Sequence, residues 1–165
     1  MNIFILDEDP AASAIMMCDK HIGKMILESA QMLSTAHRIL DTDVDDRMYK
    51  IAHKGHPCTK WVMESETNYT WLYYHMVALG KEFEFRRGKV HGTITKLQDV
   101  LATPPINIPK GPRTEFVQAM KAYPECMVEG NAVQAYRNYY HVAKDFATWE
   151  WGREAPSWWK GYQGA

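Results

Sequence analysis

The chain has 165 residues, of which 46% are hydrophobic, and a formal net charge of −1 at pH 7. This length fits one domain with a buried core, and no apolar run is long enough to span a bilayer. The acidic residues that follow Leu6 are unlike a signal peptide, and three cysteines are too few for a disulfide framework. We therefore expect a protein of the reducing cytoplasm that makes no membrane contact.

The chain begins with an apolar, β-prone lead-in at residues 2–6. Asp9-Pro10 predicts a helix start, because aspartate caps a helix well and proline fits its first turn. The apolar spacing that follows, as far as about Leu40, predicts one long helix or two abutting helices. An acidic stretch at residues 41–46 then predicts a loop.

The middle of the chain predicts three further helices. A short one begins at His56-Pro57, and Ser65 can cap a long one. Thr93 can cap the third, over residues 94–101. Each start places a capping side chain before an apolar pattern of helical period.

The last third of the chain is first irregular and then helical. Prolines and a glycine in residues 103–113 forbid regular structure. Asn131 can cap a last long helix, whose apolar face continues to Trp149, and an aromatic tail occupies residues 152–165. No strand-turn-strand pattern occurs. We therefore predict an all-α fold: a single compact domain of residues 1–165 with long helices and an irregular proline-rich loop.

A line of polar side chains follows the first long helix, opposite its apolar face. Alternating steps of three and four residues place the members on one side of a helix, and they are His21, Lys24, Glu28, Gln31, Thr35 and Arg38. A carboxylate beside an imidazole and an ammonium group can perform acid–base chemistry. The pattern alone also fits a solvated helix face with a weak Lys24–Glu28 ion pair.

Three short motifs occur in a fixed order along the chain. They are Asp19-x-His21 with Glu28 seven residues after the histidine, His56-Pro57 followed by Trp61, and Pro156-x-Trp158-Trp159-Lys160-x-Tyr162. In this order the motifs resemble those of the pyrimidine-dimer DNA glycosylase/AP lyase family, of the phage endonuclease V type. Members of that family are small, single, all-α domains.

The resemblance implies a phage-like DNA-repair enzyme, both glycosylase and lyase, that excises a damaged or modified pyrimidine from double-stranded DNA. In that family the N-terminal α-amine attacks C1′ of the nucleotide and forms an imine, and β-elimination then cuts the strand. The resemblance therefore implies Met1 as the nucleophile, Glu28 as the acid–base group and His21 as a further catalytic residue. It implies DNA binding by Lys24, Gln31, Arg38, His56, Trp158, Trp159 and Lys160.

The use of an α-amine has a physical reason. Reference pKa values are about 7.7–8.0 for α-amines and about 10.4 for lysines, and only a neutral amine is a nucleophile. Members of the phage type lose their initiator methionine and begin on a small residue. Asn2 is large, so we expect Met1 to stay and to supply the amine. We expect the enzyme to act as a monomer, without cofactor or metal, in a host cytoplasm if it is phage-encoded.

The chain also departs from the family pattern. Leu27 and Gln31 stand where the family has arginines beside the glutamate, and the loop from Thr103 to Arg113 is additional. The near-neutral charge is unusual for a DNA-binding domain. Two alternatives therefore stay open: a non-catalytic module that binds nucleic acid or protein, and an enzyme that acts on free nucleotides. His53, His56 and Cys58 lack the spacing of a usual zinc site.

Overall fold

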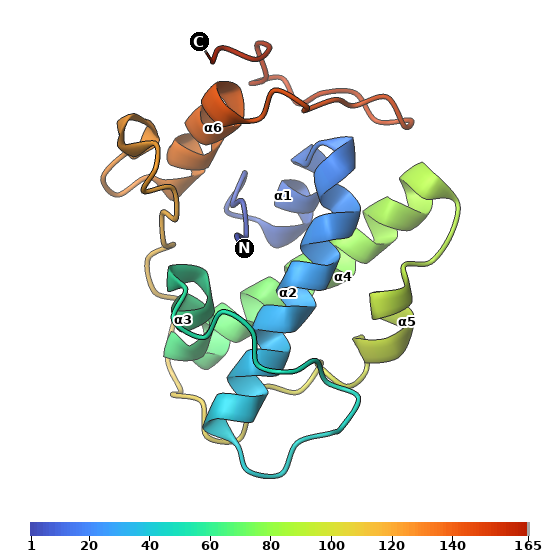
Figure 1. Cartoon of the computed structure of the whole chain (residues 1–165), viewed down its shortest axis with the longest axis vertical. Coiled ribbons are helices and arrows are strands. Elements are labelled where there is room, and N and C mark those ends of the chain that lie inside the picture. Colours follow the sequence, from blue (N-terminus) through green and yellow to red (C-terminus); the bar gives the residue numbers. More distant parts are fainter. Residues whose placement is uncertain (165) are drawn as a thin grey trace.

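The computed structural model describes residues 1–164, in which helices are joined by irregular segments and no strand occurs (Figure 1). The helices are α1 (Pro10–Met16), α2 (Asp19–Leu40), α3 (Pro57–Glu64), α4 (Glu66–Arg87), α5 (Gly92–Leu97), the short 3-10 helix η1 (Pro124–Cys126) and α6 (Ala132–Ala143). The predicted all-α class is confirmed. None of these helices, over the same residues, combines the length and apolar character needed to cross a membrane.

The predicted long N-terminal helix consists of two helices that meet at Met17 and Cys18. Both residues have extended backbone angles, which end α1 and begin α2. Asp9 caps α1 by accepting a hydrogen bond from the amide of Ala12 at 2.8 Å. The break changes the direction of the chain, and both α1 and α2 pack against α4.

Three predicted helix boundaries are wrong, and one of them is the end of α5, which lies at Leu97 and not at Leu101. His91, not Thr93, caps α5, because its Nδ1 accepts the Thr93 amide at 3.1 Å and the helix begins at Gly92. The last helix, α6, ends at Ala143, so Trp149 lies on an irregular segment and not on its apolar face. The start of α5 is set by a local cap, whereas the segment after α6 leaves the helix and contacts residues near the chain start.

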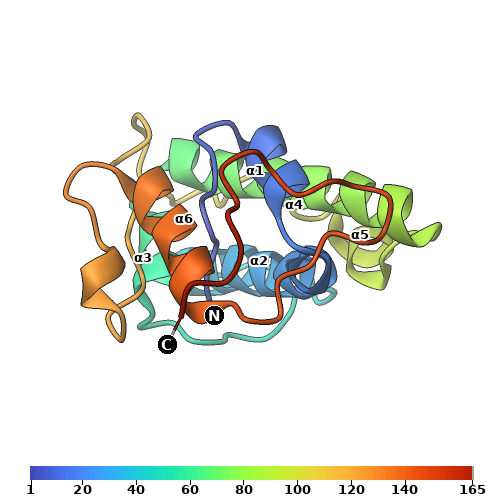
Figure 2. The ribbon, with the colours of Figure 1, turned by 90° about the horizontal axis from the view of Figure 1, so that it is seen from above.

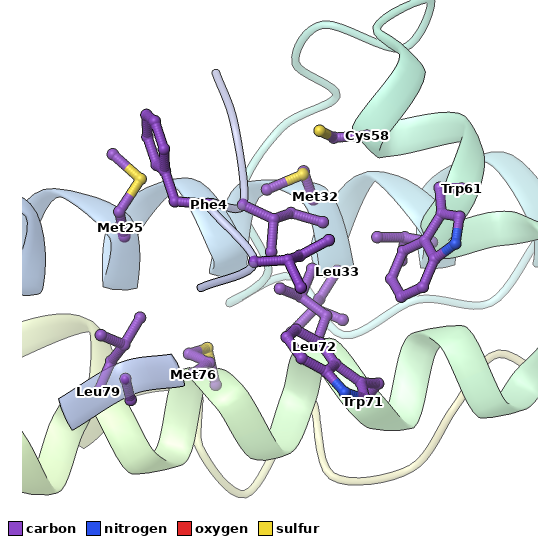
Figure 3. Close-up of a cluster of buried hydrophobic side chains, with 14 of the residues drawn as sticks. Phe4, Met25, Met32, Leu33, Cys58, Trp61, Trp71, Leu72, Met76 and Leu79 are labelled. Atoms are coloured by element: carbon purple, nitrogen blue, oxygen red, sulfur yellow. The ribbon is translucent and has the colours of Figure 1, made fainter. Parts of the chain in front are cut away.

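The hydrophobic core lies between α2 and α4 (Figure 3). Leu33 of α2 and Leu72 of α4 point toward each other there, and Trp61 of α3 closes one end. Burial of each such side chain stabilises the fold by about 1.5–3 kcal/mol. Residues 3–6 of the lead-in are also buried in this core, which brings the start of the chain beside α2 and below α6 (Figure 1).

A buried ionic cluster ties α2 and α4 to the C-terminal segment. Arg86 contacts Asp19 at 3.1 Å and Glu82 at 2.7 Å, and Arg153 contacts Glu82 at 2.8 Å. Asp19 also accepts the amide of Glu150 at 2.6 Å. Figure 2 shows this segment crossing the molecule from α6. A buried charge without a partner is costly, so removal of one member of the cluster would destabilise the fold. Asp19 of the first motif therefore has a structural role.

Candidate active site

The start of the chain meets the middle of α2 at a single carboxylate oxygen. The Met1 α-amine nitrogen lies 3.4 Å from Glu28 Oε1, and the Asn2 amide donates a hydrogen bond to the same oxygen at 3.2 Å. The Glu28 side chain is only 11% exposed. The structure therefore brings together the two residues whose chemistry was predicted as nucleophile and acid–base group.

The lead-in is held in place by its own side chains. Asn2 Nδ2 donates to the carbonyl of Ala119 at 2.8 Å, and Asn2 Oδ1 accepts the amide of Ile3 at 2.7 Å. Thr59 Oγ1 lies 3.8 Å from the sulfur of Met1. The first two residues thus contact three separate parts of the chain, which fixes the α-amine against Glu28.

Phe4 turns the lead-in and supplies a wall of the site. Its φ of 57° is left-handed, a conformation that costs a bulky residue about 1–3 kcal/mol. The turn is stabilised by Ser13, whose hydroxyl donates to the Phe4 carbonyl at 3.3 Å. The Phe4 ring stacks on the His21 ring with centroids 4.4 Å apart. Strain that the surrounding contacts enforce is typical of functional sites.

A cavity of about 210 Å³ opens in front of the α-amine and Glu28. It is below the roughly 300–1,000 Å³ of a drug-sized pocket, and its size suits one base or sugar. Amines, a carboxylate, an imidazole and aromatic rings face it together. Its lining residues are Met1, Asn2, Phe4, Lys20, His21, Lys24, Met25, Glu28, Tyr139, Lys144 and Phe146.

A larger cavity, of about 430 Å³, lies at the start of α6. Its lining includes the carboxylates of Glu8 and Glu115 and the guanidinium of Arg113, but neither an amine nor an imidazole. It therefore lacks the pairing of nucleophile and base found at the chain start. We place the candidate site in the smaller cavity on chemical grounds.

His21 is a neutral wall of the site. Its Nδ1 lies 2.7 Å from the hydroxyl of Tyr140, and only 2% of the residue is exposed. Burial, followed by the positive charges of Lys144, Lys24 and Lys20, lowers the pKa of His21 to about 3. At neutral pH the imidazole is therefore uncharged, and the catalytic role of His21 stays a prediction.

This burial of a neutral imidazole predicts a pH dependence of stability. The pKa of His21 is about 3 in the folded protein against 6.5 for the free side chain, so the unfolded chain binds the extra proton and stability falls as pH drops from 6.5 toward 3. Other buried histidines with a lowered pKa, such as His75 at about 4, act in the same direction. The free energy of unfolding, measured with urea, should fall less between pH 6.5 and pH 4.5 for His21→Asn than for the wild type. Equal slopes would contradict the buried neutral state.

The other members of the predicted line of polar side chains on α2 have different surroundings. Lys24 is exposed and lines the cavity, whereas Gln31 is partly buried beyond its lining. Arg38 donates to the carbonyls of Tyr49 and Met48, both at 2.7 Å. Its guanidinium holds the segment after α2, so any contact of Arg38 with DNA stays a prediction that competes with this role.

His56 caps α3 close to the start of the chain. Its Nδ1 accepts the amide of Cys58 at 3.0 Å. Burial, followed by the charge of the Met1 amine, lowers the pKa of His56. The residue is therefore an electrostatic neighbour of the α-amine although it does not line the cavity, and its substrate contact stays a prediction.

The aromatic tail packs against α6 and returns along it (Figure 2). Trp159 stacks on His141 with ring centroids 4.9 Å apart, and the Lys160 amide donates to His141 Nε2 at 3.0 Å. The indole nitrogen of Trp158 lies 3.5 Å from the sulfur of Met16. These tryptophans are partly buried against the domain, and their predicted binding of a DNA strand stays a prediction.

Seven lining residues were not predicted: Asn2, Phe4, Lys20 and Met25 near the chain start, and Tyr139, Lys144 and Phe146 far from it. Tyr139 lies on α6, and Lys144 and Phe146 follow its end. No local motif marks them, because they join the site through contacts with Phe4 and Lys20 at the other end of the chain. Over residues 1–164, no group of three or more histidine, cysteine or acidic side chains is arranged to hold a metal ion.

Comparison with known families gives a match over the first part of the chain. A family model described as pyrimidine dimer DNA glycosylase matches residues 1–96, more than half of the chain. The matched range contains Met1, His21, Glu28 and His56 and ends before α6. No curated protein and no solved structure matches the chain.

Proposed function

The chain belongs to the pyrimidine dimer DNA glycosylase family, and from this membership we propose a DNA glycosylase with AP lyase activity that uses the Met1 α-amine. Its substrate is double-stranded DNA with a damaged or modified pyrimidine. The observation that carries the proposal is the distance of 3.4 Å between the Met1 nitrogen and Glu28 Oε1 at the edge of a cavity. A nucleophile and a base within reach of each other support covalent catalysis.

The reaction begins when the nucleotide leaves the stack and enters the cavity. The neutral Met1 amine attacks C1′, and the bond to the base breaks with its electron pair on the base, which takes up a proton. The C1′–O4′ bond then opens, O4′ gains a proton, and C1′ and the amine nitrogen form a protonated imine. Formation of the imine splits one difficult displacement into easier steps.

Glu28 supplies the proton transfers in this scheme. Its carboxylate can accept a proton from the attacking amine, to which it is already close. It passes that proton to O4′ as the sugar ring opens and, again a carboxylate, removes a proton from C2′, so that the electron pair forms a C1′–C2′ double bond and the imine becomes an enamine. The 3′-phosphate then leaves with the electron pair of the C3′–O bond, a C2′–C3′ double bond forms, and the C1′–N imine is restored. Water hydrolyses the imine and returns the amine to its starting state. The largely buried position of Glu28 strengthens its interaction with the developing cation.

Borohydride trapping tests the proposal directly. Reduction of the imine during incubation with duplex DNA should give a stable covalent protein–DNA adduct. We expect the adduct with DNA that carries an abasic site or a pyrimidine dimer and not with undamaged DNA. Peptide mapping should locate it at Met1. Absence of the adduct from all duplexes would contradict the lyase and favour a non-catalytic module.

A further inference from the structure

Three lysines converge on the cavity from two ends of the chain. Lys20 and Lys24 belong to α2, and Lys144 follows α6. None of them takes part in an ion pair within residues 1–164. With the Met1 amine, four amines face the cavity together with one carboxylate, Glu28. We call Lys20, Lys24 and Lys144 the lysine cluster.

Aromatic rings, not carboxylates, hold two members of the lysine cluster, Lys20 and Lys144. The Lys144 nitrogen lies 4.6 Å from the ring centroid of Tyr139 and 5.1 Å from that of Phe4. Lys20 and Lys144 both lie over the ring of Phe146, at 4.4 and 6.0 Å. Cation–π contacts of this kind position an ammonium group without neutralising it, so its charge remains available to a ligand.

The members of the lysine cluster repel one another. Burial, followed by the charge of Lys24, lowers the pKa of Lys144. All three lysines lower the pKa of the adjacent His21. Four amines and one carboxylate leave a net positive field in the cavity. Such a field favours a negatively charged ligand, because a partly enclosed site focuses it on the ligand.

We propose that the lysine cluster forms an oxyanion-binding subsite, which holds a negatively charged group of the substrate beside the reacting carbon. The position of the reacting carbon rests on the proposed function. Lys24 stands about 6 Å and Lys20 about 12 Å along α2 from Glu28. These distances are comparable to the size of one nucleotide. The bound anion therefore belongs to the nucleotide in the cavity or to its immediate neighbour.

Two sources provide such an oxyanion. One is a phosphate of the strand beside the extruded nucleotide, and the other is an acidic substituent on a modified pyrimidine. Either group would meet the charge of the lysine cluster, because all three lysines line the cavity. The lysine cluster would bind both oxyanions by the same charge interaction. Duplexes that differ only in the substituent on the pyrimidine distinguish the two sources.

The salt dependence of binding tests the subsite. Lys144→Met keeps the length and packing of the side chain but removes its charge, whereas Lys144→Arg keeps the charge. Lys110→Met is the control, because Lys110 is an exposed lysine paired with Glu66 at 3.4 Å. We measure the dissociation constant against salt for three duplexes. They carry an abasic site, a 5-methyl pyrimidine and a 5-carboxyl pyrimidine.

If the anion is a strand phosphate, Lys144→Met should weaken binding of all three duplexes about tenfold at 0.1 M salt and reduce the salt slope by about 0.9. If it is a base substituent, only the 5-carboxyl duplex should lose affinity. Lys144→Arg should restore either effect. Unchanged binding of every duplex by a folded Lys144→Met protein would overturn the subsite.

Trapping separates this inference from the proposed function. A wild type that gives no adduct but shows the charge-dependent binding would refute the lyase and leave the subsite standing. Loss of trapping in both Lys144 variants, with binding and salt slope intact, would instead assign Lys144 to the chemistry and overturn its role in anion binding. Melting temperatures of the variants verify that each comparison is made on folded protein.

Discussion

Glu28→Gln is expected to abolish imine trapping and strand cleavage while leaving the fold intact. Glutamine has nearly the same shape, and its side chain can still accept the Asn2 amide, which lies 3.2 Å from Glu28 Oε1. The amide does not titrate, so removal of the proton from C2′ loses its base. Loss of general base catalysis alone lowers the rate by about 10²–10⁴-fold. Single-turnover cleavage of abasic duplex measures this loss.

The matched control is Glu66→Gln, an acidic residue at the start of α4 whose exposed side chain pairs with Lys110. It should cleave at the wild-type rate. The melting temperatures of both variants should stay close to that of the parent. Unchanged cleavage by a folded Glu28→Gln protein would refute the assignment of Glu28 as the acid–base group.

Blocking the N-terminus should have an even larger effect on trapping. One residue added before Met1 displaces the reactive amine by up to about 3.5 Å, and acetylation removes its nucleophilic lone pair. The Met1 side chain is only 2% exposed and is already packed, so the site cannot absorb the displacement by a small shift. A misplacement of this size costs a near-attack geometry several orders of magnitude. Borohydride trapping should become undetectable.

DNA binding should survive the same change. Affinity depends on phosphate contacts from lysines and arginines, so the salt dependence should keep close to the same slope. The same residue added after Ala165 serves as the control and should leave trapping unchanged. Full trapping by a blocked N-terminus would refute Met1 as the nucleophile and direct attention to a lysine of the cavity, Lys24 or Lys144.

The helices were predictable because their signals are local. Asp9, Ser65 and Asn131 cap the helices that they were expected to cap, each by accepting the amide three residues ahead. The apolar stripe of α2 is buried as its period predicts. The end of α6 was not predictable, since Phe146 continues the apolar spacing and leaves the helix to contact residues near the chain start.

The candidate site also contains residues that the sequence could predict and residues that it could not. Glu28 could be found from its place on a polar helix face and from the family motif, and Met1 from the resemblance to the family. Arg38 belongs to the same face but bonds the segment that follows α2. A helical period shows which side chains share a face, and it does not show which of them the rest of the chain will occupy. Lys144 could not be found, because it reaches the site through the ring of Phe4, at the other end of the chain.

The cavity has a consequence for the order of assembly. Its two sides come from the ends of the chain: Asn2 bonds Ala119, and the nitrogen of Lys144 lies over the ring of Phe4. Contacts of such long sequence separation form late in folding, because the entropy of closing the loop must be overcome first. A chain emerging from the ribosome therefore exposes its α-amine to solvent, without a cavity wall, until residues 139–146 have been made. The enclosed site is a property of the completed chain, and no fragment that lacks α6 can contain it.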